Sequence, residues 1–432
     1  MVTKDKQYVE HMDALQAFSR GLQEPEWMLQ LRLEALKQID SLEPPVIERL
    51  RYTRWPLWQV PNLTGAPAPL SIDPYEYIED KADTARVVQT GNDTVIETLP
   101  ESLKEKGVIF TDLHTALREH PELVKEAYMT KVVKPGENKI TAFHAAFMNS
   151  GLFLYVPKNL ELTDPLEAVF IQNSLVEDSF VKHVLIYADT NSNFNYVEKF
   201  LTKGDKKNAA NIMVEVIAKA GAQVKYSAVD QLGVNSTVYF HRKGYTHRDA
   251  TIDWAIGVMN SGNVIADFDT DLVGNGSSSD LKAVGISNGR QTQVIDSNVV
   301  NFGNSTQGNI FQHGVILDSA TLTFNGIGHI IKGAKQADAQ QESRVLMLSD
   351  KARGDANPIL LIDEFEVTAG HAASVGRVDP EEMYYLMSRG IEQQEAERLV
   401  IRGFLGAVIQ AIPLKGVRDE LVETIERKLT TK

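Results

Sequence analysis

Cysteine is absent from all 432 residues of the sequence. The chain therefore forms no disulfide, and it holds no zinc ion or iron–sulfur cluster with thiolates of its own. Long apolar runs are also absent, since none approaches the ~20 residues that a membrane-spanning helix needs. The first six residues, Met1 to Lys6, are charged rather than apolar, so we expect no signal peptide and a cytoplasmic location.

Positive charge is in short supply. The chain has 44 basic residues against 58 acidic ones, which gives a formal net charge of −14. A negative field of this size opposes binding to a nucleic acid backbone or to an anionic membrane surface. We therefore expect neither nucleic acid nor a membrane among the partners of this protein.

The motifs of several common enzyme classes are missing as well. The chain has no Gly-x-x-x-x-Gly-Lys-Ser/Thr phosphate loop, no His-Glu-x-x-His and no Gly-x-Ser-x-Gly. The Gly-x-Gly pair at Gly326 and Gly328 lies among strand-like segments without a following amphipathic helix, which argues against dinucleotide binding. The sequence thus predicts a protein that does not hydrolyse ATP by itself.

What the sequence does contain divides it into three parts. Residues 1–135 are predicted to be mostly helical, with one helix starting at Glu24-Pro25-Glu26, since proline is tolerated in the first turn of a helix. Residues 136–372 form one short apolar run after another, separated by turn-forming Asn, Gly and Asp residues. Several of these runs alternate with period two, which is typical of β-strands. Residues 373–432 are predicted to be a helical domain.

Two all-β architectures fit the middle part of the chain. Strands would start ~10–14 residues apart, and both a sandwich of hairpins and a stacked β-solenoid allow that spacing. No clear sequence repeat separates the two. The periodicity alone therefore leaves the sandwich and the solenoid as open alternatives.

The helical tail has the clearest boundaries. Asp379 is a suitable cap, and Pro380 fits the first helical position. A second helix is predicted from roughly Gln393 to Ile412, where Pro413 ends it. A further apolar stripe at helical spacing follows in residues 417–429.

Two groups of side chains were weighed as metal sites. His241 and His247 flank Gly244, close enough to share a metal ion, but we favour a solvated turn for this pair. The ten histidines are otherwise scattered, and none forms a close pair on one face of a predicted helix.

The aspartates Asp267, Asp269 and Asp271 repeat at period two, which would put three carboxylates on one face of a strand. A calcium site or a polysaccharide-lyase site would use such a row. We favour an ordinary polar outer face with Ala266 and Phe268 inward, because neither EF-hand spacing nor a basic catalytic partner accompanies the aspartates.

His371 is the strongest candidate for a functional side chain. It lies in the polar segment 363–376, which we predict to be a short hinge between the β-rich part and the helical tail. Neutral imidazole binds borderline metals such as iron. One histidine cannot make a metal site, so the other ligands would come from a partner subunit. The alternative is a histidine that only packs or caps at a domain junction.

Several longer motifs indicate a known family. They are densest in residues 337–349, in His-Ala-Ala-Ser-Val-Gly at 371–376, and in residues 384–391 and 403–405. Through these motifs the chain resembles the SufB/SufD family of iron–sulfur cluster assembly proteins over nearly its whole length. Within that family it resembles the SufD branch, because the SufB branch carries cysteines and typically a glutamate at the position of Ala372.

The resemblance implies a mainly β fold, in which a right-handed parallel β-helix lies between helical N- and C-terminal regions. It also implies a non-catalytic subunit of the SUF complex that pairs with the paralogue SufB and with the ATPase SufC. SufC would bind the C-terminal helical domain. The predicted docking residues are Tyr384, Leu386, Arg389, Gly390, Leu399 and Phe404.

By motif, His371 corresponds to the histidine that is thought to act at the SufB–SufD interface together with a SufB cysteine. The resemblance thus implies a nascent iron–sulfur cluster or iron that is shared transiently with SufB. It implies no cofactor bound tightly by this chain alone, and it leaves open whether a reduced flavin supplies electrons in the complex.

Three other functions were weighed against this one. A homodimeric iron-binding scaffold would place His371 of two copies face to face. A purely structural adaptor would leave His371 inert. A β-helix enzyme acting on polysaccharide would normally need export and an acidic–basic catalytic cluster, and the sequence shows neither.

Overall fold

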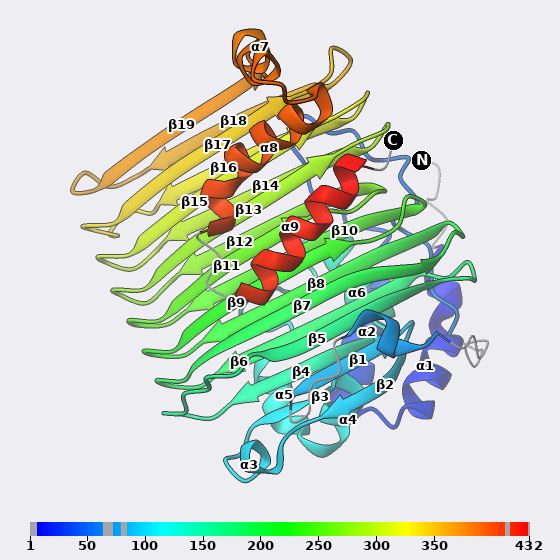
Figure 1. Ribbon diagram of the computed structural model, residues 1–432. Helices are drawn as coiled ribbons and strands as arrows, with labels where there is room; N and C mark the ends of the chain where they lie inside the picture. The colour runs from blue at the N-terminus through cyan, green and yellow to red at the C-terminus, as the bar shows by residue number, and fades with distance from the viewer. Residues whose placement is uncertain (1–6, 64–71, 79–83, 411–414, 431–432) are drawn as a thin grey trace, which may run out of the picture.

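The computed structural model describes residues 7–63, 72–78, 84–410 and 415–430. Two large sheets dominate this part of the chain, and from residue 150 onward successive strands alternate between them (Figure 1). The first sheet contains, in spatial order, β19 (Thr368–Arg377), β17 (Asp338–Met347), β15 (Gln307–Ile316), β13 (Ser278–Ser287), β11 (Thr251–Val258), β9 (Gln223–Gln231), β7 (Asn193–Gly204), β5 (Leu166–Ser174), β1 (Arg86–Thr90) and β2 (Asp93–Thr98). The second sheet contains β18 (Arg353–Ile362), β16 (Thr321–Ile330), β14 (Thr292–Asn301), β12 (Asn263–Leu272), β10 (Ser236–Thr246), β8 (Asn208–Ala218), β6 (Phe180–Ala188), β4 (Ser150–Val156) and β3 (Ile109–Asp112).

The pairing pattern makes this fold a solenoid rather than a sandwich of hairpins. From β4 onward each strand pairs in parallel with the strand two places along the chain, for example β10 with β12. A hairpin sandwich would instead join consecutive strands antiparallel. The chain therefore winds through about eight turns, which confirms the predicted β-helix core with helical flanks.

The space between the two sheets is filled by stacked apolar side chains. The rings of Phe170 and Phe200 stack with centroids 4.8 Å apart, and Trp254 lies 4.7 Å from Tyr226 in the same interior. Each such residue is on the inward side of its strand because alternate side chains point to opposite faces. Burial of one large apolar side chain stabilises the fold by about 1.5–3 kcal/mol.

A charged cluster centred on Arg242 lies inside this apolar interior. The guanidinium of Arg242 lies 2.8 Å from Glu198 and 2.7 Å from Asp230, and all three side chains are inaccessible to solvent. Burial raises the pKa of both carboxyl groups, although the charge of Arg242 opposes that rise. A buried charge is tolerated only when it is paired in this way.

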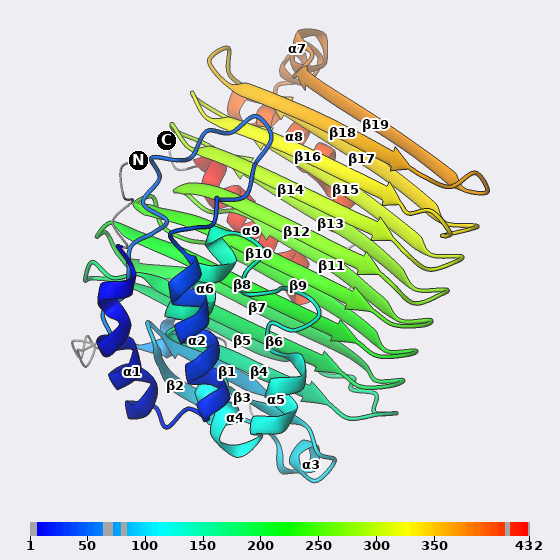
Figure 2. The same cartoon turned by 180° about the vertical axis from the view of Figure 1, so that it is seen from behind.

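The N-terminal helices cover the outer face of the second sheet (Figure 2). They are α1 (Met12–Gly21), α2 (Glu26–Gln38), α4 (Leu113–Glu119), α5 (Pro121–Ala127) and α6 (Lys139–Phe147), and the short α3 (Glu101–Lys104) lies at the end of the solenoid. The predicted helix start at Glu24-Pro25-Glu26 is confirmed, because Pro25 precedes the first residue of α2. Three strands, β1 to β3, also lie within residues 86–112 and continue both sheets.

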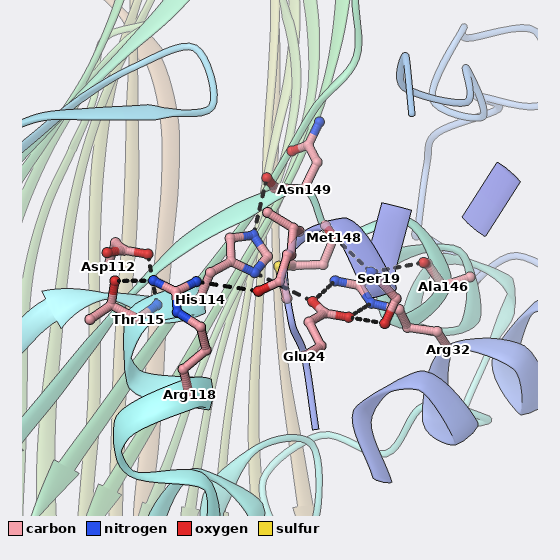
Figure 3. Close-up of polar contacts among 11 residues, drawn as sticks. Ser19, Glu24, Arg32, Asp112, His114, Thr115, Arg118, Ala146, Met148 and Asn149 are labelled. Carbon is pink, nitrogen blue, oxygen red and sulfur yellow. Dashed lines mark hydrogen bonds and ion pairs between the residues drawn. The ribbon is translucent and has the colours of Figure 1, made fainter. Parts of the chain in front are cut away.

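A buried arginine joins these helices to the solenoid (Figure 3). Arg32 donates to both carboxylate oxygens of Glu24 at 2.6 and 2.8 Å, and to the carbonyl oxygens of Ala146 and Met148 at 3.0 and 2.8 Å. Burial opposes ionisation of Glu24, but Arg32 and His114 together hold the pKa of that carboxyl far below its usual range. The pair therefore ties α2 to the end of α6 and the start of β4.

The C-terminal helices are α7 (Pro380–Ser388), α8 (Gln393–Gln410) and α9 (Lys415–Thr430). The predicted cap is confirmed, since Asp379 accepts a hydrogen bond from the Glu381 amide at 2.8 Å and Pro380 is the first helical residue. The predicted end of the second helix at Ile412 and Pro413 lies outside the described residues. Figure 1 shows α8 and α9 across the outer face of the first sheet and α7 beyond β19.

No helix in the described ranges is both long and apolar enough to cross a membrane. The division of the chain into residues 1–135, 136–372 and 373–432 stays a prediction.

Candidate functional site

The solenoid has an open end formed by β18 and β19 (Figure 1). Within the described residues, β19 pairs in its sheet with β17 alone and β18 pairs with β16 alone. The other edge of each strand therefore presents backbone N–H and C=O groups without a strand partner. Such an edge is a template for pairing with a further chain.

His371 lies in β19, at this open end. The predicted hinge at residues 363–376 is wrong, because residues 368–377 form a strand whose register with β17 is continuous. Gly370, Gly376 and the small residues between them resemble a loop in sequence. The backbone is held in strand conformation by its pairing with β17, which no local pattern reveals.

The strand register shows on which face of the sheet His371 lies. His371 pairs with Gln341 of β17, and paired residues in a parallel sheet share one face. Gln341 is 5% exposed, and its Nε2 donates across the interior to the Ile359 carbonyl at 3.0 Å. His371 is thus on the inward-facing row of the last coil, above Gln341, and it is exposed because no coil covers it.

Other core-type positions are uncovered at the same end. Val375, on the same row as His371, is 40% exposed, and Ile362 of β18 is 46% exposed. Their counterparts one coil below, Val345 and Ile330, are 2% and 0% exposed. The open end therefore exposes side chains at positions that are buried in the coils below, and His371 is one of them.

A histidine that the sequence analysis did not single out links this end to helix α8. The ring of His313 in β15 stacks on Phe404 of α8, with centroids 5.2 Å apart and an interplanar angle of 27°. Its Nδ1 lies 3.1 Å from the Phe404 carbonyl oxygen, and its Nε2 lies 2.9 Å from Glu342 Oε1. The hydrogen bond from His313 lowers the pKa of Glu342.

Glu342 in turn pairs with Ala372, the residue after His371. Helix α8 is therefore linked to the neighbourhood of His371 by the two polar contacts of His313 and by the strand pairing of Glu342 with Ala372. Sequence spacing gave no sign of it, since His313 and Phe404 are 91 residues apart.

The predicted docking residues fall into two groups. Tyr384 (75% exposed), Arg389 and Gly390 lie on the open surface of α7 and its end, where Gly390 has a φ of +87° that favours glycine. Leu386 is half-buried on the same helix. The guanidinium of Arg389 lies over the ring of Tyr385 at 5.2 Å.

The other two predicted docking residues are in α8 and differ in exposure. Leu399 is 40% exposed, whereas Phe404 is half-buried against His313. The residues of α8 that are most buried against the first sheet are Ile401, Leu405, Val408 and Ile409. The structure thus places four of the predicted docking residues on α7 or at its end and the other two on α8.

A second polar cluster lies on the outer face of the second sheet. The solvated turn predicted for His241 is wrong, because His241 lies within β10 and is 5% exposed. Its Nε2 is 3.3 Å from Asp269 Oδ2 and 4.0 Å from Asp267 Oδ2. His247 follows the end of β10 and is not part of this cluster.

The row of aspartates in β12 is oriented as predicted. Asp267, Asp269 and Asp271 are on the outer face, and Ala266 and Phe268 are buried in the solenoid. Burial and the charge of Asp269 raise the pKa of Asp267 to about 7. The sequence missed their contact with His241 because that contact joins residues one coil apart.

Comparison with known proteins agrees with the fold. Residues 170–404 match the family model described as the SufBD core domain of SUF system FeS cluster assembly, and residues 4–168 match the SufBD protein N-terminal region. The iron–sulfur cluster assembly protein SufD of Bacillus subtilis is 47% identical to this chain over 430 residues, which cover 96% of this chain and 97% of that protein.

More distant relatives cover nearly the same length. An iron–sulfur cluster assembly SufBD family protein of Staphylococcus haemolyticus is 27% identical over 92% of this chain and 88% of its own length. A SufBD family protein of Staphylococcus aureus is 27% identical over 91% of this chain and 87% of its own length.

The structure defines a two-sheet β-solenoid with helices at both ends and an uncovered end coil. The chain belongs to the SufBD family of the SUF iron–sulfur cluster assembly system. Its similarity to the Bacillus subtilis protein is a similarity to SufD, which confirms the branch predicted from the motifs.

Proposed function

We propose that this chain is the non-catalytic SufD-type subunit of a cytoplasmic complex with SufB and the ATPase SufC. In this complex a nascent iron–sulfur cluster, or iron, is held as cargo between SufB and this chain through His371. One observation carries the proposal: His371 is exposed on the core-facing row of an unpaired end coil. An end of this kind is suited to a second solenoid, which would continue both sheets and cover Val375 and Ile362.

The chemistry of the cargo also requires a second chain. The sequence offers no thiolate, and His371 alone supplies one neutral nitrogen ligand. A cysteine thiolate of the partner, brought across the paired edge strands, would complete the site. Because most ligands would come from the partner, the cargo would bind weakly to this chain in isolation.

The C-terminal helices support docking of the ATPase. The surface of α7 presents Tyr384, Tyr385 and Met387 at 75%, 57% and 43% exposure. Exposed aromatic residues beside an arginine are typical of protein interfaces. Movement of α7 and α8 by SufC would reach the open end through the contact of Phe404 with His313.

The test is anaerobic co-expression of this chain with SufB and SufC, followed by measurement of iron and sulfide in the purified complex. We expect a stable mixed complex whose iron and sulfide content falls when His371 is replaced by Ala, whether or not reduced flavin is supplied as the electron donor. His329→Ala is a matched control, since His329 is a partly exposed histidine on the outer face of β16 that pairs with Asp363 at 3.0 Å.

The alternatives predict different results. A homodimeric iron-binding scaffold would form without SufB and would lose iron with His371→Ala in the absence of partners. A structural adaptor would form the mixed complex, yet cluster content would be the same with and without His371. Failure to form any complex with SufB would refute the proposed function.

A further inference from the structure

The outer face of the second sheet carries a cluster of metal-ligating side chains that the proposed function does not use. Three neighbouring strands contribute to it in register: His241 of β10 pairs with Asp267 of β12, which pairs with Asp296 of β14. Asp269 is the next residue on the same face of β12, two positions after Asp267, and it pairs with Asn298 of β14. Parallel strands lie about 4.8 Å apart, so these side chains form a compact patch of one imidazole and several oxygens.

The ligand atoms are spaced as a small divalent cation requires. His241 Nε2, one oxygen of Asp267 and one oxygen of Asp269 all lie within 4.8 Å of one another. The two shorter spacings from the imidazole are 3.3 and 4.0 Å. A cation with bonds of about 2.1 Å to nitrogen and oxygen in tetrahedral geometry separates its ligands by about 3.4 Å.

A hydrogen bond from a neighbouring residue orients one of the carboxylates. The phenol of Tyr239 donates to Asp267 Oδ2 at 3.0 Å. Ligands of protein metal sites are commonly held by such outer hydrogen bonds, which fix their direction before the ion binds. Tyr239 is itself 1% exposed, so its ring is enclosed by the surrounding packing.

Two oxygens beside the cluster lack partners. Asp296 Oδ1 and Asn298 Oδ1 are buried atoms without a hydrogen-bond partner among the described residues. They belong to the ladder neighbours of Asp267 and Asp269. Buried polar atoms are rarely left unpaired, so both oxygens are able to accept a further hydrogen bond beside the cluster.

Acidic side chains are concentrated on this part of the face. Asp267 and Asp269 lie beside the His241 imidazole, and the ammonium of Lys243 is paired with Asp271 at 3.2 Å. The patch remains reachable from solvent, because the side chains of Asp267 and Asp269 are 19% and 17% exposed.

We propose that His241, Asp267 and Asp269 bind one divalent first-row transition cation. The donor set selects this class, because imidazole with carboxylates suits Fe²⁺, Mn²⁺ or Zn²⁺, whereas Ca²⁺ and Mg²⁺ prefer oxygen ligands alone. The site is separate from His371, which lies in the other sheet. The proposed metal site can therefore be tested independently of the pairing with SufB.

The experiment measures binding of Zn²⁺, and of Fe²⁺ under anaerobic conditions, to the untagged full-length chain by equilibrium dialysis and elemental analysis. Every protein in this experiment also carries His371→Ala, so that a metal ion bound by His371 at the open end is not counted. We expect about one ion per chain, and an affinity at least ~10-fold lower for Asp269→Asn and for His241→Gln. Asp271→Asn is the matched control, since it removes a carboxylate from the same face of the same strand, and it should bind as before.

Folding and location are checked in the same samples. The thermal midpoint of each variant identifies a loss of fold, and Asp269→Asn, which is isosteric and partly exposed, keeps the test valid if His241→Gln does not fold. Anomalous diffraction at the zinc edge should place the ion between His241 and Asp269. Absence of a bound ion, equal binding by Asp269→Asn, equal loss with Asp271→Asn, or an ion found elsewhere would each overturn the proposal.

Discussion

The imidazole of His313 is held between the Phe404 ring, which it stacks on at 5.2 Å, and the Glu342 carboxylate at 2.9 Å. This arrangement joins a helix proposed to contact the ATPase to the strand beside β19. Both ring nitrogens and one ring face of His313 are engaged, so this one side chain connects α8 to β17.

Replacing Phe404 with Ala should loosen α8 on the first sheet. The loss of the stacked ring and its packing is expected to lower the free energy of unfolding by about 1–3 kcal/mol and to speed hydrogen exchange in α8. Leu399→Ala is the control, since Leu399 is in the same helix but 40% exposed, and it should change stability by roughly 0.5 kcal/mol or less. Equal exchange in α8 of both variants would contradict the assigned contact.

A charge on the uncovered row of the open end should prevent pairing with SufB. Val375→Asp puts a carboxylate on the same row as His371, in a surface that would become buried, while the isolated chain should lose no more than about 1 kcal/mol because Val375 is 40% exposed. Co-purification with SufB is the measurement. Val95→Asp is the matched control, because Val95 is 45% exposed in β2, the edge strand at the opposite end of the same sheet. Retention of SufB by Val375→Asp would exclude this end as the interface.

The attachment of α9 should depend on pH through Lys428. Its Nζ donates to the Asn260 carbonyl oxygen at 2.7 Å, and burial lowers the pKa of this lysine to about 8 from an ordinary value near 10.5. The folded state therefore binds fewer protons than the unfolded state between pH 8 and 10.5, so the contribution of Lys428 to stability rises with pH across that window.

The measurement is the free energy of unfolding of the native chain minus that of Lys428→Met, recorded from pH 7 to 10.5. The difference should be flat below about pH 8 and then increase, by at most about 3 kcal/mol. A difference that stays constant, or that falls as pH rises, would show that Lys428 is not buried as its ammonium.

The Arg32–Glu24 pair should be among the most sensitive points of the N-terminal region. Arg32→Ala leaves the Glu24 carboxylate buried at 1% side-chain exposure without its cation, so we expect a loss of about 3–5 kcal/mol in chemical denaturation. Arg118→Ala serves as the control, because Arg118 (Figure 3) is an exposed arginine of the same region, and it donates to the Leu22 carbonyl oxygen. Similar losses in the two variants would argue against a special role for the buried pair.

Local patterns predicted those features that depend on neighbouring residues. The cap at Asp379, the helix start after Pro25 and the outward face of Asp267, Asp269 and Asp271 were all confirmed. Each follows from capping chemistry or from the period-two geometry of a single strand. The hinge predicted around His371 failed for a related reason, since small residues and glycines look like a loop until a partner strand is known.

The sequence by itself determined that this protein has no thiolate chemistry of its own, that its middle part is made of strands and that its tail is helical. Its motifs further indicated the family. Only the tertiary structure decided that His371 is on an uncovered inner row, that His313 meets Phe404, and that His241 faces two aspartates. These contacts join residues from adjacent coils or from elements far apart in the chain, so their geometry depends on strand register and packing, for which a single sequence carries no local signal.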